Sequence, residues 1–385
     1  MDIIELNNNI TLGEDSCRQF KKNITNAESL SAEFVAFSNA SGGLMFIGVN
    51  DNGTITGLTS DDIHRINQLV SNVSSQHVQP AINVFVKNIK TDNGIVMVIE
   101  IPAGINKPYQ DKNGVFWVKS GADKRKATSR EEIQRIFQRA NLLYADETPV
   151  RNTSINNIDS EFFADYFYKR FKESLKNKNI PAEKILENMH LMIDGQLTIS
   201  GALLFAKQPF FGTPMFIVKA GAFDDFNIST NNYTDSKDIT GNLVDIFKQT
   251  VWFIISHLHH VQKDQGFNSL GIPEILYESI EEIVANALIH RDYFISAPIK
   301  AFIFKDRVEI ISPGHLPNNL TVESIKLGNS VVRNPVLASH ANHLLPYRGY
   351  GSGIITALAN YPHIDFYDDK EGNVFKVVLQ RGKNP

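Results

Sequence analysis

A row of polar side chains with catalytic potential lies on one face of an expected helix at 281–293. Glu282, Asn286 and His290 stand four residues apart, so they point to the same side of the helix. Apolar residues at three- and four-residue spacing form a neighbouring stripe that can face a core. A carboxylate can orient or deprotonate water, and an amide oxygen is a hard ligand for Mg²⁺. The row indicates a site for magnesium and a nucleotide phosphate; the alternative is a solvated helix face.

A glycine-rich turn supplies a second part of such a site. Gly349, Gly351 and Gly353 precede an expected helix at 354–360. Glycines let backbone amides approach a phosphate closely, and the amino end of a helix favours an anion. The turn does not follow a strand in a unit with a later acidic residue, so it is not the dinucleotide-binding motif. It predicts a phosphate contact of another kind.

The composition is that of a multidomain globular protein. The chain has 385 residues, of which 42% are hydrophobic and 21% charged, with a formal net charge of −4. This acidic balance excludes a globally basic nucleic-acid binder, so any such surface must be local. The single cysteine, Cys17, excludes a disulfide framework and favours a cytoplasmic location. We expect no signal peptide and no membrane association, because no apolar run approaches the ~18 residues of a membrane span.

Breaks in the hydrophobic pattern predict three domains, because a single core rarely grows to this length. The segment at 146–149 contains acidic residues and a proline that interrupt the pattern. The middle part contains a long amphipathic helix at 242–261. We therefore expect three domains, at 1–145, 146–265 and 266–385, of which the second connects the other two.

The first 140 residues alternate helical and strand patterns, with two helices expected at 12–40 and a buried strand at 44–49. They contain Gly13-Glu14, Phe20-Lys21, the run AFSNASGGLMFIGVNDNGTITG and the later FWVKSG. With these motifs, residues 10–140 resemble the Schlafen/AlbA-type domain, also called the divergent AAA domain. The resemblance implies an α+β domain that binds DNA or RNA.

The same resemblance raises the question of cleavage, since Schlafen proteins cleave RNA with three acidic residues. Glu14 matches the first acidic position, and Asp51 aligns with the third. Gln19 stands at the second position and cannot supply a negative charge for a metal ion. We therefore expect binding without metal-dependent cleavage, and a residual nuclease site at Glu14 and Asp51 is the alternative.

A local basic segment offers a surface for a phosphate backbone. Its positive residues are Lys119, Lys124, Arg125, Lys126 and Arg130. Lysine and arginine at this density bind phosphates without reading base sequence. The segment predicts nucleic-acid binding, and a solvated loop and helix face is the alternative.

The last part of the chain contains the motifs NALIHRDY, DRVEIISPGHLP, RNP and GSGI, in this order. With these motifs, residues 270–380 resemble the ATP-binding fold shared by gyrase, heat-shock chaperones, histidine kinases and mismatch-repair ATPases. They are most similar to the RecG-like C-terminal branch, found in transcriptional-regulator proteins. The resemblance implies a Bergerat-type α/β sandwich that binds ATP with Mg²⁺.

The resemblance also assigns roles to residues of this chain. Glu282 would be the base that orients water, and Asn286 the magnesium ligand. Ser312 stands where the wider superfamily has an adenine-reading aspartate, which leaves purine identity open. The remaining nucleotide-binding residues would be His290, Gly314, Arg333, Gly349, Gly351 and Gly353.

These observations together predict an ATP-binding, nucleic-acid-binding regulatory protein, either a transcriptional regulator or a defence component. Nucleotide binding would control conformation or assembly into a homo-oligomer, a dimer or higher. Slow ATP hydrolysis is left open. The alternatives are an ATP-regulated metal-dependent nuclease and a degenerate scaffold for protein contacts.

Overall fold

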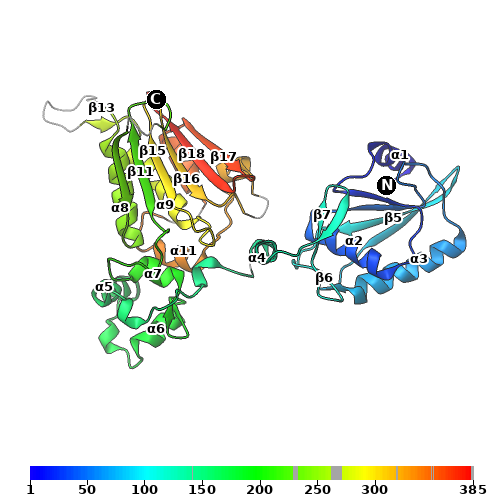
Figure 1. Ribbon diagram of the computed structural model, residues 1–385, viewed down its shortest axis with the longest axis horizontal. Coiled ribbons are helices and arrows are strands. Elements are labelled where there is room, and N and C mark those ends of the chain that lie inside the picture. Colours follow the sequence, from blue (N-terminus) through cyan, green and yellow to red (C-terminus); the bar gives the residue numbers. More distant parts are fainter. Residues whose placement is uncertain are drawn as a thin grey trace. The chain divides into compact units, whose positions relative to one another are not determined.

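The computed structural model shows two compact units, Met1–Leu143 and Tyr144–Pro385 (Figure 1). Both mix helices and sheets, which confirms the expected α+β class. Arg348 and Tyr350, which belong to the glycine-rich turn, lie outside the described residues, as do the side chains of Glu131, Arg139 and Val261. The structure describes residues 1–140, 142–228, 233–261, 271–317, 320–347, 349 and 351–382.

The N-terminal unit is built on a four-stranded sheet in the order β1-β2-β5-β4. Strand β1 runs parallel to β2, and the other neighbours are antiparallel. The strands are β1 (Arg18–Lys21), β2 (Gly42–Ile47), β4 (Phe85–Thr91) and β5 (Gly94–Pro102). The other elements are α1 (Ile3–Leu12), α2 (Ala27–Asn39), α3 (Ser60–Asn72), η1 (Val73–His77), β3 (Val78–Gln79), β6 (Gln110–Asp111), β7 (Trp117–Ser120), β8 (Asp123–Lys126) and α4 (Arg130–Arg139).

Strand β1 replaces part of the helix expected from residue 12 onward, so that expectation was wrong. Phe20 pairs in register with Phe46 of β2, and both side chains are fully buried. Their rings meet edge to face with centroids 5.7 Å apart. Burial of this aromatic pair between the sheet and α1 favours an extended segment over a helix.

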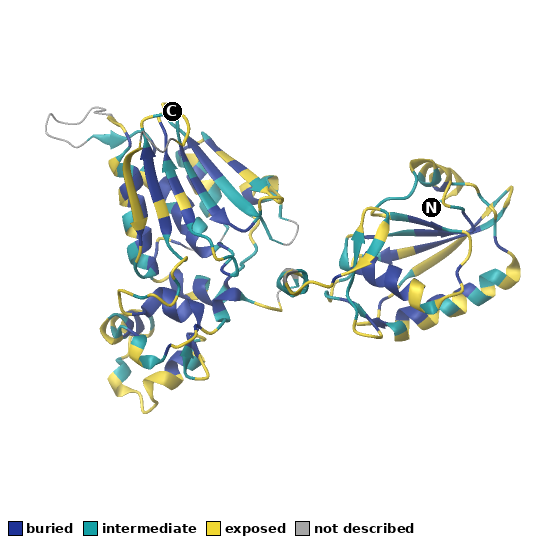
Figure 2. Ribbon diagram, viewed as in Figure 1, coloured by how far each residue is buried: buried dark blue, intermediate teal, exposed yellow. Residues whose placement is uncertain are grey.

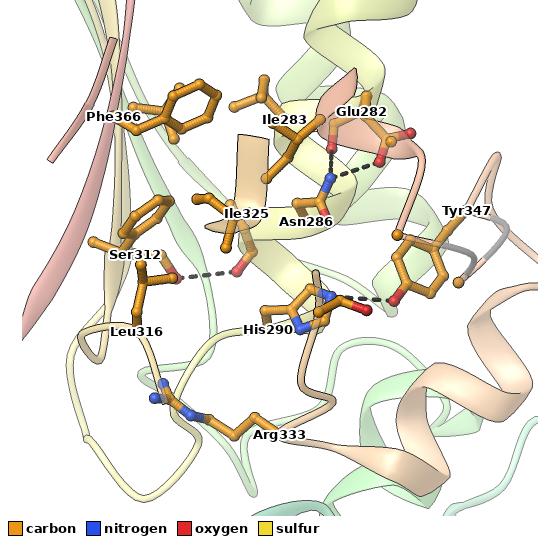
Figure 3. A pocket seen from close by; sticks show the side chains of 18 of the residues that line it. Glu282, Ile283, Asn286, His290, Ser312, Leu316, Ile325, Arg333, Tyr347 and Phe366 are labelled. Atoms are coloured by element: carbon orange, nitrogen blue, oxygen red, sulfur yellow. Dashed lines mark hydrogen bonds between the residues drawn. The ribbon is translucent and has the colours of Figure 1, made fainter. Parts of the chain in front are cut away.

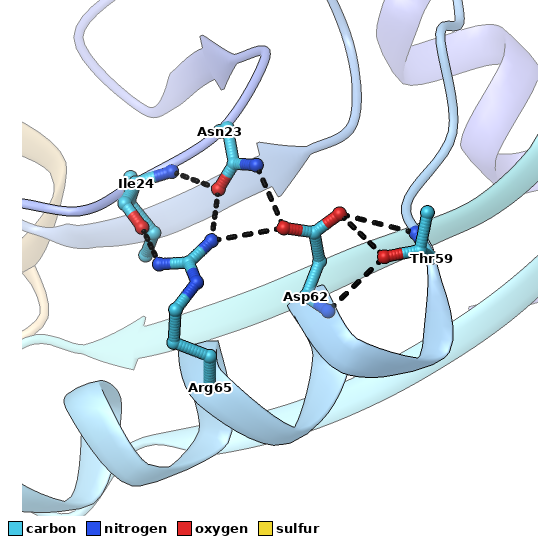
Figure 4. A network of polar contacts seen from close by, with 5 residues as sticks. All are labelled: Asn23, Ile24, Thr59, Asp62 and Arg65. Atoms are coloured by element: carbon cyan, nitrogen blue, oxygen red, sulfur yellow. Dashed lines mark hydrogen bonds and ion pairs between the residues drawn. The ribbon is translucent and has the colours of Figure 1, made fainter.

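A polar network fastens the segment after β1 to the beginning of α3 (Figure 4). Arg65 donates to the Ile24 carbonyl at 2.6 Å and to Asn23 Oδ1 at 2.6 Å. Asp62 accepts from Asn23 Nδ2 at 3.0 Å and forms a capping box with Thr59. The Asn23 hydrogen bond, followed by those of Thr59 and Arg65, lowers the pKa of Asp62.

The C-terminal unit contains a six-stranded sheet in the order β12-β11-β15-β16-β18-β17. Neighbouring strands are antiparallel except β11 and β15, which are parallel. The strands are β11 (Val218–Phe223), β12 (Tyr233–Ile239), β15 (Ile299–Ile303), β16 (Arg307–Pro313), β17 (Ile364–Asp369) and β18 (Val374–Gln380). Helices α8 and α9 pack on one face of this sheet (Figure 1). This arrangement is the α/β sandwich expected for the C-terminal part.

Helix α9 carries the polar row at the centre of this sandwich. It packs against α8, α12 and β16, and its apolar stripe of Ile283, Val284 and Leu288 is buried. The helices of the unit are α5 (Ser160–Phe171), α6 (Ala182–Asn188), α7 (Ile199–Phe205), α8 (Leu243–Ser256), α9 (Tyr277–Ile289), α10 (Val322–Lys326), α11 (Pro335–Ala341) and α12 (Gly353–Asn360). Its short elements are η2 (Ala145–Glu147), η3 (Ile155–Asn157), η4 (Leu175–Asn177), β9 (Met192–Ile193), β10 (Gln196–Leu197), β13 (His260–Val261) and β14 (Ile272–Pro273).

The domain boundary expected at 265 is wrong, because the residues on both sides of it belong to one compact unit. Strands β11 and β12 lie in the expected connecting domain, yet β11 pairs along its length with β15. One hydrophobic core runs from Ala145 to Leu379 and includes both segments. The first unit ends at Leu143, beside the break expected at 146. Among the described residues, we find no helix with the length and apolar character needed to cross a membrane.

Candidate functional site

A cavity of about 580 Å³ in the C-terminal unit is enclosed by α9, the sheet and the loops that lead into α11 and α12 (Figure 3). This volume suits a nucleotide-sized ligand. The structure brings every C-terminal site residue predicted from the sequence to the wall of this one cavity. These residues are Glu282, Asn286, His290, Gly314, Arg333, Gly349, Gly351 and Gly353.

The Glu282–Asn286 pair is formed within one turn of α9. Asn286 Nδ2 donates to Glu282 Oε1 at 2.6 Å and to the Glu282 carbonyl at 2.8 Å. Because the amide nitrogen is committed to Glu282, the amide oxygen is the atom of Asn286 suited to a cation. Burial raises the pKa of the Glu282 carboxyl; the Asn286 hydrogen bond opposes this effect, and the charge of Glu281 adds to it. The pair thus combines an amide oxygen that is available to a cation with a carboxylate that burial makes a stronger base than an exposed one.

The glycine-rich turn fits closely between α9 and the turn after α10. A Cβ atom on Gly353, the first residue of α12, would lie 1.6 Å from Glu282 Oε1. A Cβ on Gly351 would lie 2.1 Å from the Gly328 carbonyl oxygen, and Gly351 has a φ of +72°. Glycine is therefore required at Gly351 by both space and backbone conformation, whereas a side chain at Gly353 would have to displace the Glu282 carboxylate.

His290 connects the end of α9 to the residue before this turn. Its Nε2 lies 3.1 Å from the Tyr347 hydroxyl, within hydrogen-bond distance (Figure 3). Burial, with a smaller effect from the charge of Arg333, lowers the pKa of His290 to about 4. Burial, followed by the charge of Glu282, raises the pKa of Tyr347 to about 12. Both side chains are therefore neutral at pH 7, so this contact positions the turn without adding charge to the cavity.

Arg333 brings a positive charge to the cavity wall. Its Nη2 donates to the His315 carbonyl at 2.6 Å. A Cβ on Gly314 would lie 2.2 Å from Arg333 Nη1, so the glycine makes room for the guanidinium. Burial lowers the pKa of Arg333, whereas Asp292 and Asp368 raise it. An arginine remains protonated at neutral pH, so this group can neutralise a phosphate.

An apolar wall completes the cavity on the side of the sheet. Phe366, Phe375 and Val377 come from β17 and β18. Ser312 Oγ donates to the Ala287 carbonyl at 3.1 Å, which leaves the hydroxyl oxygen as an acceptor. The prediction of site residues missed Tyr347 and this wall. The signals for them were a tyrosine two residues before the first glycine and the alternating apolar residues of the last two strands.

The N-terminal unit joins Glu14, Gln19 and Lys119 in one half-buried cluster. Gln19 Nε2 and the Phe20 backbone N–H both donate to Glu14 Oε1, at 2.6 and 2.7 Å. Lys119 Nζ donates to Gln19 Oε1 at 3.1 Å and lies 4.5 Å from the centre of the Phe37 ring. Burial lowers the pKa of Lys119, and the nearby Glu33 opposes this effect. The ammonium group of Lys119 therefore lies beside Glu14 and Gln19, the residues at the first two positions of the acidic pattern.

Asp51 is not part of this hydrogen-bonded cluster in the described residues. It is exposed in the turn after β2. Within the described part of the chain, no hydrogen bond or ion pair joins Asp51 to Glu14 or Gln19.

Two cations of the basic segment are paired with carboxylates of the same unit. Lys124 Nζ lies 2.7 Å from Glu33 Oε1, and Glu33 is buried. Arg125 makes a two-pronged contact with Glu132, at 2.6 and 2.9 Å. These pairings reduce the positive charge that the segment presents to a ligand.

Lys126 and Arg130, the cations outside these pairs and outside the Glu14 cluster, are exposed. Lys126 is exposed, and its Nζ lies 5.3 Å from the centre of the Trp117 ring. Arg130 is exposed at the first position of α4. An ammonium beside an indole face can contact a phosphate while the ring stacks with a base.

Comparison with known families matches one model to each unit. Residues 14–128 match the family described as "Schlafen, AlbA_2". Residues 296–378 match the family described as "Putative ATP-dependent DNA helicase recG C-terminal". The chain joins a Schlafen AlbA_2 domain to a RecG-type C-terminal domain. The second match includes the glycine-rich turn and Arg333 but begins after α9. The assignment of Glu282 and Asn286 to the site therefore rests on the geometry of the cavity and not on this match.

The solved structures that are similar to the chain include the following two. The DIP2311 protein of Corynebacterium diphtheriae is 20% identical with a TM-score of 0.47; the match covers 96% of this chain and 76% of that one. The N-terminal domain of a "Putative ATP-dependent DNA Helicase RecG-related Protein" from Nitrosomonas europaea is 18% identical with a TM-score of 0.25. That match covers 34% of this chain and 96% of the other. No curated protein matches the chain.

Proposed function

We propose that this protein binds Mg–ATP in the C-terminal cavity and DNA or RNA through its N-terminal unit. Binding of the nucleotide would control conformation or assembly, in a regulatory role such as transcription control or defence. One observation carries the nucleotide part of the proposal. Glu282, Asn286, Arg333 and the glycine-rich turn come from separate elements and meet around one cavity.

The residues of the cavity fit a magnesium nucleotide. Asn286 would hold the metal through its amide oxygen, and Arg333 would contact a phosphate. Gly351 and Gly353 occupy positions where a Cβ atom would collide, so only the backbone lines that part of the wall. The apolar residues of β17 and β18 would cover the base. Bound Mg²⁺ would neutralise phosphate charge.

Glu282 is the group we propose for orienting and deprotonating a water molecule. Its carboxylate accepts from Asn286 Nδ2, which fixes its orientation, and burial raises its pKa. A carboxylate with a raised pKa is a stronger base than an exposed one. We expect slow hydrolysis, so that the bound nucleotide serves chiefly as a conformational signal.

For the N-terminal unit we propose binding without cleavage. Lys119 donates to Gln19, and Gln19 donates to Glu14, so one neutral and one cationic group surround the remaining carboxylate. A divalent cation would meet repulsion from the Lys119 ammonium in this cluster. Lys126 and Arg130 are exposed and can contact phosphates.

A thermal-unfolding panel with ATP, GTP, ADP and GDP, with and without Mg²⁺, tests the nucleotide site. A ligand at 100 times its dissociation constant stabilises the folded state by about 2.7 kcal/mol, which gives a measurable shift. The shift should disappear in Asn286→Ala and persist in Asn156→Ala, where an exposed side chain far from the cavity lining is removed. No shift with any nucleotide would refute the proposal, and equal shifts in both variants would refute the role of Asn286.

Incubation with labelled RNA and DNA, with and without Mn²⁺, separates binding from cleavage. Retention of intact nucleic acid supports our proposal. Cleavage that Glu14→Gln abolishes would instead establish the nuclease alternative. A chain that binds neither nucleotide nor nucleic acid would be the scaffold alternative.

A further inference from the structure

Strand β12 forms one edge of the six-stranded sheet and pairs with β11. Six of its seven residues are exposed, and only Ile239 is buried (Figure 2). In the described ranges of the chain, no strand pairs with its outer edge. A long edge without proline presents a row of backbone donors and acceptors that can pair with another strand.

The charged residues of β12 are divided between the two faces of the sheet, with Asp235 and Lys237 on one face and Asp238 on the other. Asp235 and Lys237 are in register with buried alanines of β11, so they lie on the face covered by α8. Lys237 Nζ donates to Gln249 Oε1 of α8 at 3.0 Å. Asp235 Oδ2 lies 3.3 Å from His257 Nε2 at the end of the same helix. Asp235 and Lys237 therefore carry opposite charges on the same face of the strand, one residue before and one residue after Ser236.

We propose that β12 pairs antiparallel with β12 of a second copy of this chain, centred on Ser236. In this register Ser236 faces its own counterpart. Asp235 of each copy then faces Lys237 of the other, which places two pairs of opposite charges across the junction. Cross-strand pairs of opposite charge stabilise antiparallel strands. The two sheets would continue as one, with both α8 helices on the same face.

The charges of the strand select this register over its neighbours. A shift of two residues in one direction would place Asp235 opposite Asp235, and the opposite shift would place Lys237 opposite Lys237. Like charges directly opposite each other are destabilising. A shift of one residue would pair side chains from opposite faces of the two sheets. The centre at Ser236 is therefore the arrangement that the sequence of the edge supports.

An exposed tryptophan lies beside the proposed junction. Trp252 is 69% exposed, and it follows Gln249 by three residues on the same side of α8. Gln249 reaches β12 through Lys237, so this side of the helix is directed toward the sheet edge. A second copy joined at β12 would bring its own α8 to this side and cover the indole ring. Tryptophan is favoured at protein interfaces for its large contact area.

Disulfide trapping tests the register directly. The one native cysteine, Cys17, is exposed, so the experiment uses full-length protein with Cys17→Ser. Ser236→Cys should form a dimer rapidly under mild oxidation, because the two thiols face each other. Asp235→Cys and Lys237→Cys are matched controls, since each would face itself only in a shifted register. Faster trapping at either control position, or none at position 236, would overturn the proposal.

Variants with exchanged charges at positions 235 and 237 provide a second test, in which sedimentation velocity measures dimerisation. Asp235→Lys and Lys237→Asp should each weaken dimerisation at least about tenfold, because each creates two like-charge pairs. The double variant should recover dimerisation, since it restores opposite charges. Thermal unfolding checks that every variant is folded. A monomeric wild-type chain, or equal association of all four proteins, would contradict the inference, while nucleotide-dependent stabilisation would remain a separate result.

Discussion

Glu282 and Gly353 meet so closely that a Cβ atom on the glycine would lie 1.6 Å from Glu282 Oε1. The first residue of α12 is thereby held against the polar row of α9. Asn286 holds the same carboxylate from within α9 at 2.6 Å. The proposed base and the proposed phosphate-binding turn therefore share one contact, and a change on either side should affect both.

Substitution of Gly353 tests this shared contact. Gly353→Ala should weaken ATP binding at least about tenfold, because the new methyl group must displace the Glu282 carboxylate or the beginning of α12. Calorimetric titration measures the affinity. Asn156→Ala is the control, since its exposed side chain is not among the residues that line the cavity and its loss should leave binding nearly unchanged. Equal affinities in Gly353→Ala and the wild type would show that the turn moves away from Glu282 when the ligand binds.

Removal of the Glu282 charge should separate binding from hydrolysis. Glu282→Gln keeps an acceptor for Asn286, so binding should persist, whereas hydrolysis should fall by about 100-fold or more. The pKa of Glu282 is raised by burial. Hydrolysis by the wild type should therefore decline as the pH falls through this raised pKa, since the protonated carboxyl cannot accept a proton. Phosphate release measured across pH tests both statements. An unchanged rate in Glu282→Gln would assign the base elsewhere; exposed Glu161→Gln, outside the cavity lining, is the control and should keep the wild-type rate.

Acid should weaken the C-terminal unit through His340. Its Nδ1 lies 2.7 Å from the Tyr166 hydroxyl, and its Nε2 donates to the Met189 carbonyl at 3.1 Å. Burial lowers the pKa of His340 from 6.5 to about 4. The unfolded chain therefore binds the proton first, so stability is fully present above pH 6.5 and is lost as the pH falls toward 4. The difference corresponds to about 3 kcal/mol.

Urea unfolding across this pH range measures the effect of His340. His340→Gln should show a smaller loss of stability on acidification than the wild type. Exposed His259→Gln should follow the wild type. Parallel pH profiles for wild type and His340→Gln would mean that another group causes the acid sensitivity.

Asp146 should act in the opposite direction. Burial raises its pKa from 3.8 to about 6, although the Leu337 backbone N–H donates to Oδ2 at 2.8 Å. Stability from this residue is greatest below pH 3.8 and is lost as the pH rises through 6, because ionisation is disfavoured in the folded state. Asp146→Asn keeps an acceptor for Leu337 and should stabilise the protein more at pH 7 than at pH 5. Urea unfolding should show no such difference for exposed Asp165→Asn, and its absence in Asp146→Asn would refute the assignment.

The sequence was informative about the site wherever the chemistry depended on local spacing. The row at 282–290 and the glycines at 349–353 follow helix and turn geometry, so their positions on the wall of one cavity could be predicted. The predicted helix from residue 12 onward failed because β1 is stabilised by parallel pairing with β2, a partner more than twenty residues away. The boundary at 265 failed for the same reason, since β11 finds its partner β15 across the whole of α8 and α9.

The ion-pair partners of the basic residues also could not be predicted from residue spacing in the sequence. Glu33 is ninety-one positions from Lys124, yet the two groups lie 2.7 Å apart. A count of lysines and arginines along the chain treats all five basic residues alike. The fold instead divides them into cations that stabilise the unit and cations that face solvent, and this division has consequences for nucleic-acid binding.

Lys126 and Lys124 should therefore respond differently to substitution. Lys126→Ala removes an exposed charge, so it should weaken nucleic-acid binding and reduce the slope of log affinity against log salt by about one. Lys124→Ala leaves the buried Glu33 carboxylate without its ammonium partner, and breaking such a pair costs about 3 kcal/mol or more. Its main effect should be a lower unfolding temperature.

Fluorescence anisotropy at several salt concentrations, combined with thermal unfolding, distinguishes these effects. Lys22→Ala is a control for a surface lysine outside the basic segment. The double variant Lys124→Ala/Glu33→Gln should recover part of the stability, because it removes the unpaired charge as well. If Lys124→Ala were as stable as the wild type and lost one unit of salt slope, Lys124 would contact phosphate and the Glu33 pair would be incidental. If Lys126→Ala bound as the wild type does, the nucleic-acid surface would lie on another face of the N-terminal unit.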